Sequence, residues 1–136
     1  MVMLMKIDWR FIMKTKLNFK IEKESITPNG HKYNGQELVD KMRQKVNEGR
    51  LFLDSLADGT NPDIQIKSIT GRIVDFNLQS NGEVVFDIEP INSHLIPKEI
   101  SIAGQGDLNE ETNEVENFNL IKMIPVLDAG FYEYTN

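Results

Sequence analysis

The chain has 136 residues, of which 40% are hydrophobic and 26% charged, as is typical of one ordinary globular domain. Its net charge of -6 and pI of about 4.9 argue against a nucleic-acid groove, because such a groove needs a concentrated basic face to displace counterions. The absence of cysteine excludes disulfide bonds and zinc sites built on thiolates.

The N-terminal segment 1–13 is apolar and rich in methionine. It is too short to span a bilayer, is interrupted by three charged residues, and lacks the basic, apolar, small order of a secretion signal. We therefore expect no membrane partner. Two interpretations stay open: an upstream extension with translation starting at Met13, or an arm that docks on a neighbouring subunit. The predicted organisation is an extension or arm over 1–13 and one domain over 14–136.

The first predicted elements are a strand, a turn and a helix. Residues 17–21 alternate apolar and polar side chains, which predicts a half-buried strand. Residues 27–30 (Thr-Pro-Asn-Gly) predict a turn. Asn34 is placed to cap a helix over 35–48, which Gly49 ends.

The middle of the chain predicts strands. Residues 50–54 form a short apolar run, and 64–78 predict a long strand whose alternation breaks near Gly71, as at a bulge or bend. Residues 80–82 (Ser-Asn-Gly) are a strong hairpin signal, and 84–88 predict the returning strand.

The last part predicts a short strand starting at Ile100, an acidic solvated loop over 107–117, a strand over 118–124 and an aromatic tail. The whole pattern predicts a mainly β, mostly antiparallel protein with one main helix. A small β-barrel or strongly bent sheet is the natural arrangement, since closure removes exposed strand edges.

Three segments, in this order, resemble the prohead (capsid maturation) serine proteases of tailed phages: 29–33 (Asn-Gly-His-Lys-Tyr), 50–55 (Arg-Leu-Phe-Leu-Asp-Ser) and 100–106 (Ile-Ser-Ile-Ala-Gly-Gln-Gly). In that family the second segment carries a catalytic histidine directly after Leu-Asp, and the third carries a nucleophilic serine after an apolar residue. Those two places hold Ser55 and Ala103 here.

The resemblance runs from about residue 29 to residue 129 and implies the family's small β-barrel with helices packed around it. It also implies that catalysis is lost. Ala103 has no hydroxyl to attack a peptide bond, and Ser55 has no group that titrates near neutral pH and so cannot act as the base. The backbone of 104–106 is left as a nest that would bind an oxyanion rather than cut.

One alternative keeps an active site. If the alignment slips by two residues, Ser101 becomes the nucleophile, because residues two apart on a strand share a face. His94, seven residues before it, would then be the base.

No metal or other cofactor is expected. The two histidines lack a spaced partner, and three acids after the short apolar strand do not follow the spacing of a calcium loop. Those acids are Asp54, Asp58 and Asp63.

The resemblance implies a non-catalytic structural or auxiliary protein of a tailed-phage virion, such as a head decoration protein. Its partners would be the major capsid protein or other head proteins, with a homo-oligomer as a further expectation. It would reside in the virion, and in the host cytoplasm during assembly. Alternatives are the active protease and an unrelated small β binding module. Aromatic side chains at both ends are the predicted partner contacts: Trp9, Phe11, Phe131, Tyr132 and Tyr134.

Overall fold

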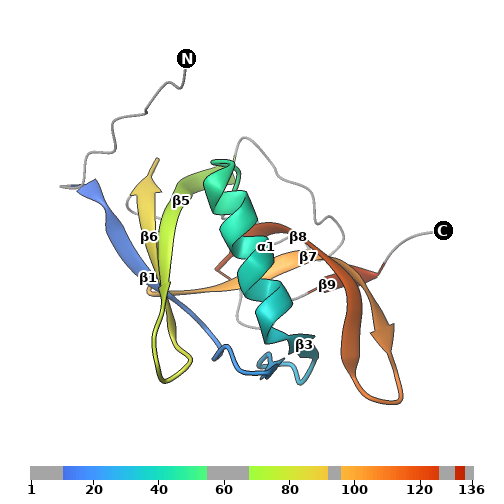
Figure 1. The fold of residues 1–136 in the computed structure, drawn as a ribbon. Helices are drawn as coiled ribbons and strands as arrows, with labels where there is room; N and C mark the ends of the chain where they lie inside the picture. Colours follow the sequence, from blue (N-terminus) through green and yellow to red (C-terminus); the bar gives the residue numbers. More distant parts are fainter. Residues whose placement is uncertain (1–10, 55–67, 92–95, 126–130, 134–136) are drawn as a thin grey trace.

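The computed structural model describes residues 11–54, 68–91, 96–125 and 131–133. Six strands form a closed barrel: β1 (Met13–Leu17), β4 (Phe52–Asp54), β5 (Ile69–Leu78), β6 (Val84–Pro90), β7 (Glu99–Asn109) and β8 (Glu114–Ile124). Their order is β8-β4-β5-β6-β1-β7, and pairing of β7 with β8 closes the ring. The predicted mainly β barrel with one main helix is therefore confirmed (Figure 1).

Three short strands extend the sheet beyond the ring. β3 (Lys32–Asn34) joins β8 and carries β2 (Glu24–Ile26), while β9 (Phe131–Glu133) joins β7. Four of the six contacts in the ring are antiparallel, as predicted, but β1 lies parallel to β7 and β4 parallel to β8.

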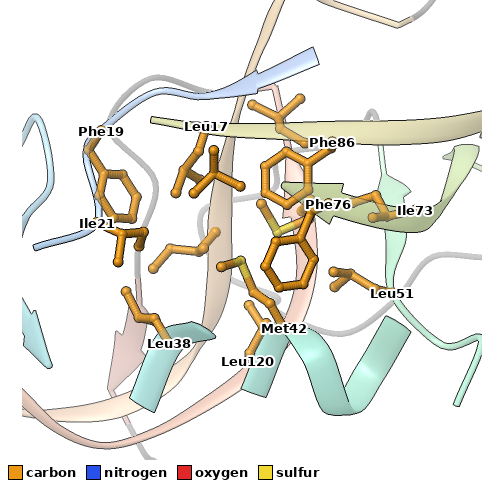
Figure 2. Close-up of a cluster of buried hydrophobic side chains, with 14 of the residues drawn as sticks. Leu17, Phe19, Ile21, Leu38, Met42, Leu51, Ile73, Phe76, Phe86 and Leu120 are labelled. Carbon is orange, nitrogen blue, oxygen red and sulfur yellow. The ribbon is translucent and has the colours of Figure 1, made fainter. Parts of the chain in front are cut away.

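The helix α1 spans Gly35–Asn47 and follows its sequence signals. The Asn34 side chain accepts a hydrogen bond from the Glu37 backbone N–H at 3.1 Å, which satisfies a donor at the helix start. Gly49 has φ of 69°, the left-handed conformation that ends helices. Leu38 and Met42 bury the apolar face of α1 against the barrel (Figure 2).

The hairpin between β5 and β6 also forms where predicted. The Gln79 N–H donates to the Glu83 carbonyl at 2.8 Å, and Gly82 takes the positive φ of 90° that the turn needs. The predicted break near Gly71 is a shift in the β4–β5 register that passes over Thr70.

The barrel interior is filled by aliphatic and aromatic side chains from every part of the ring (Figure 2). Phe86 is fully buried, and its ring centre lies 6.0 Å from that of Phe76. Burial of this apolar surface is the main stabilising contribution to the fold.

The predicted strand over 17–21 is wrong in position. The strand is β1, which pairs with β6 from Met13 onward, so the last residue of the predicted arm belongs to the barrel. Phe19 and Ile21 are buried in the core, although residues 18–21 lie outside the ladder. The apolar residues of this segment alternate with polar ones because their side chains are buried, and a segment outside a strand can bury alternate side chains too.

The predicted acidic loop over 107–117 is instead the end of a long hairpin. β7 runs to Asn109 and β8 starts at Glu114, with a turn between them. Its charged side chains are exposed beside the paired Leu108 and Val115, and this ribbon extends beyond the barrel (Figure 1). Polar composition suggested a loop because the charged side chains of this ribbon are exposed, although Val115 is buried and Leu108 is half-buried.

Tyr33 is a buried tyrosine whose hydroxyl has no hydrogen-bond partner among the described residues. Its ring packs edge-on against Phe118, with ring centres 5.1 Å apart. Burial raises the pKa of Tyr33. The folded protein therefore keeps this proton at alkaline pH, where the unfolded chain loses it.

This raised pKa predicts a pH-dependent stability. Above about pH 10, the ordinary pKa of tyrosine, the unfolded state binds fewer protons, so the free energy of unfolding falls as pH rises, by up to about 1.4 kcal/mol per pH unit. Tyr33→Phe should remove the part of this fall in the free energy of unfolding with pH that Tyr33 causes. It should also raise stability near pH 7 by about 1 kcal/mol, since a buried unpaired hydroxyl is removed. Urea unfolding of both proteins between pH 7 and 11 measures both effects, and identical alkaline slopes would contradict the assignment.

Candidate functional site

A buried ion pair lies in the barrel wall where the protease resemblance would place the active site. Lys122 Nζ on β8 lies 2.9 Å from Asp54 Oδ2 at the end of β4, and both side chains are essentially inaccessible to solvent. The Ser68 hydroxyl donates a hydrogen bond to the other carboxylate oxygen of Asp54. The charges are thus paired and hydrogen-bonded, as buried charges must be.

The pair lies on the outer face of the barrel wall. Leu53 and Met123, cross-strand neighbours on β4 and β8, belong to the core cluster. Successive strand residues point to opposite faces. Asp54, which follows Leu53, and Lys122, which precedes Met123, therefore point away from the core.

Ala103 shares this face with the ion pair. It lies directly opposite Lys122 in the β7–β8 ladder, and directly paired residues point to the same side. The methyl group at the predicted nucleophile position is therefore beside the Lys122 side chain. It is completely buried.

Ser101, the alternative nucleophile, also lies on this face of β7, opposite Ile124. It is completely buried, and its hydroxyl has no hydrogen-bond partner among the described residues. The structure therefore places Ser101 and Ala103 on the same buried face of the barrel wall as the ion pair.

The two histidines do not complete a described serine–histidine pair. His31, the one histidine in the described part of the chain, precedes β3, which meets β8 at Glu114. Ser101 pairs with the opposite end of β8, at Ile124. His94 and Ser55 lie outside the described residues.

The predicted partner contacts are only partly visible. Phe11 is 64% exposed at the start of the described chain. Phe131 and Tyr132 belong to β9, an edge strand of the sheet. Trp9 and Tyr134 lie outside the described residues.

The expected oxyanion nest over 104–106 is wrong. These residues pair with β8 on one side, apart from the bulged Gly106, and with β9 on the other. A backbone flanked by two ladders is not an open cradle for a ligand. The glycines serve close packing instead, because a Cβ on Gly104 would lie 2.0 Å from the Asn119 carbonyl oxygen.

Gly104→Ala is therefore expected to destabilise the protein by about 1–3 kcal/mol, since strand β8 must move to admit the methyl group. Gly30→Ala is a partial control, because a Cβ there meets nothing within 4 Å although its φ of 86° adds some strain. Urea unfolding of the three proteins measures the difference. A Gly104→Ala protein as stable as the original would contradict the close approach of β7 and β8.

The described residues of the site form no recognisable metal centre. Within the described ranges, no group of three or more His, Cys, Asp or Glu side chains is arranged to hold a metal ion. Asp54, one of the three acids considered above, is committed to Lys122 and Ser68, and Asp58 and Asp63 lie outside the described residues. No helix in the described part of the chain is long and apolar enough to cross a membrane.

Lys122 and Ser68 were missed from the sequence. The available signal was a pair of opposite charges in apolar strands, since Lys122 interrupts Leu-Ile-Lys-Met-Ile and Asp54 ends Leu-Phe-Leu-Asp. Taken alone, each of these charged residues is predicted to point from its strand into solvent. Only the parallel β4–β8 contact, between segments 68 residues apart, unites them.

Comparisons of the chain with models of protein families, with curated proteins and with solved structures found no match.

Proposed function

We propose that this chain is a non-catalytic structural or auxiliary protein of a tailed-phage particle, which uses a prohead-protease-like barrel to bind the major capsid protein or another head protein. The observation that carries the proposal is the chemistry at Ala103. The resemblance puts Ala103 at the place of the nucleophile. Its buried methyl group lies opposite Lys122, whose amine is already bound to Asp54, and this supports the proposal.

The arrangement of side chains on this face of the barrel wall supports binding rather than hydrolysis. A serine hydrolase needs a nucleophile, a base within hydrogen-bond reach and donors for the oxyanion, all open to substrate. Here Ser101 is buried and its hydroxyl contacts no described base, and the backbone after Ala103 is paired on both sides. A rigid barrel without a catalytic site still offers its surface to a partner protein.

Co-expression with the major capsid protein of the same phage tests the proposal. Affinity capture of this chain should retain the capsid protein, at its full precursor length. A chain carrying Ser101→Ala should behave identically, because no hydrolysis depends on that hydroxyl. Failure to retain any head protein of that phage, or precursor cleavage that Ser101→Ala abolishes, would overturn the proposal and favour the protease.

A further inference from the structure

Over much of its length, one edge of β8 pairs with none of the described strands. On that side, β3 meets β8 at Glu114 and β4 meets it at Met123, and no other described strand pairs there. Helix α1 lies along the interval, and Lys41 Nζ donates a hydrogen bond to the Phe118 carbonyl. A backbone group of β8 is thus met by a side chain where a sheet would supply another strand.

A groove opens along this edge. A cavity of about 690 Å³ lies between β3, the start of α1 and residues 114–117 of β8. On the other side of the Lys41–Phe118 contact, a separate hollow of about 230 Å³ lies between α1 and residues 118–120, and two lysines and one glutamate line it. The groove therefore has a helix on one wall and a strand edge on the other, which is the arrangement in which extended peptides add to sheets.

The larger cavity is negatively charged. It is lined by four glutamates and two lysines, giving a formal charge of 2 - 4 = -2. Glu24 is offset by Lys32, whose Nζ lies 3.4 Å from the carboxylate. Glu37 on α1 and Glu114 and Glu116 on β8 are exposed around the same cavity.

We propose that this groove between α1 and β8 binds an extended, lysine- or arginine-bearing segment of a partner protein, which adds as a strand to the open edge of β8. This inference rests on the proposed function, because it names the segment by which a head protein would be held. Backbone hydrogen bonds to β8 supply affinity, and Glu37, Glu114 and Glu116 select a basic segment.

Synthetic peptides test the mode of binding. The probe is a fluorescein-labelled octapeptide of alternating lysine and valine, titrated against the full chain by fluorescence anisotropy. A second peptide has the same sequence with alternate backbone amides methylated, so that it keeps the charge but loses the hydrogen bonds along one edge. A third has glutamate in place of lysine. We expect the methylated and the acidic peptides to bind at least about tenfold more weakly.

Charge reversal on the protein locates the site. Glu37→Lys and Glu116→Lys together should weaken binding of the lysine peptide about tenfold, whereas Glu99→Lys, an exposed change on β7 outside the groove, should leave most of it. Backbone amide shifts of residues 114–117 in NMR spectra should move on addition of the unmethylated peptide.

If the methylated peptide bound as tightly as the unmethylated one, binding would depend on charge attraction alone, and the proposal would be overturned. The absence of any binding would also overturn it. Amide shifts confined to another part of the chain would overturn it too. These failures are distinguishable from failure of the proposed function, since capture of the capsid protein by the wild-type chain would then persist and would be unaffected by the Glu37→Lys, Glu116→Lys variant.

Discussion

Removing one charge of the Asp54–Lys122 pair is expected to lower the free energy of unfolding by about 3–5 kcal/mol. Either Lys122→Ala or Asp54→Ala removes one charge of a fully buried ion pair, and the loss of the carboxylate also removes the acceptor of the Ser68 hydrogen bond. Urea unfolding at pH 7, followed by circular dichroism, measures the effect.

Two further variants make this result specific. Replacing both charges together, with Asp54→Leu and Lys122→Met, should recover most of the lost stability, because a buried ion pair exchanged for apolar side chains is often near neutral. Arg50→Ala, which removes an exposed ion pair to Glu48 at 3.8 Å, should cost less than about 1 kcal/mol. Single variants as stable as Arg50→Ala would contradict the buried pair.

Phe86→Ala is expected to destabilise the protein by about 3–5 kcal/mol. Phe86 has no exposed surface and packs beside Phe76 in the barrel interior, so the truncation leaves a cavity that a closed barrel cannot easily collapse (Figure 2). Urea unfolding is again the measurement.

The matched control for the core prediction is Phe11→Ala, the same truncation at a side chain that is 64% exposed. It should change the free energy of unfolding by less than about 1 kcal/mol. Comparable losses in the two variants would mean that the barrel interior is not the main source of stability.

Local signals predicted the fold class well. The Asn34 cap and Gly49 bounded the helix, and the turn at 80–82 placed a hairpin, because these features depend on backbone conformations that few residues adopt. Burial alternation was less reliable. It placed a strand over 17–21, where core side chains sit on a segment outside the sheet, and it missed the solvated ribbon formed by β7 and β8.

The candidate site was predictable only in part. The sequence located Ala103 and Ser101 on one strand face, and the register of β7 bears this out. The charged residues that share that face with them come from other parts of the chain. Lys122 reaches Asp54 only through a parallel contact between β4 and β8, and no local pattern specifies which distant strands become neighbours. The pairing of residues 104–106 with β9 is likewise non-local.

Intact-mass spectrometry of purified chain incubated with the capsid precursor of the same phage tests the central claim most directly. The proposal predicts a complex in which both proteins keep their full masses after prolonged incubation, with no difference between the original chain and Ser101→Ala. Time-dependent appearance of precursor fragments with the original chain, and their absence with Ser101→Ala, would contradict a barrel that binds without cutting.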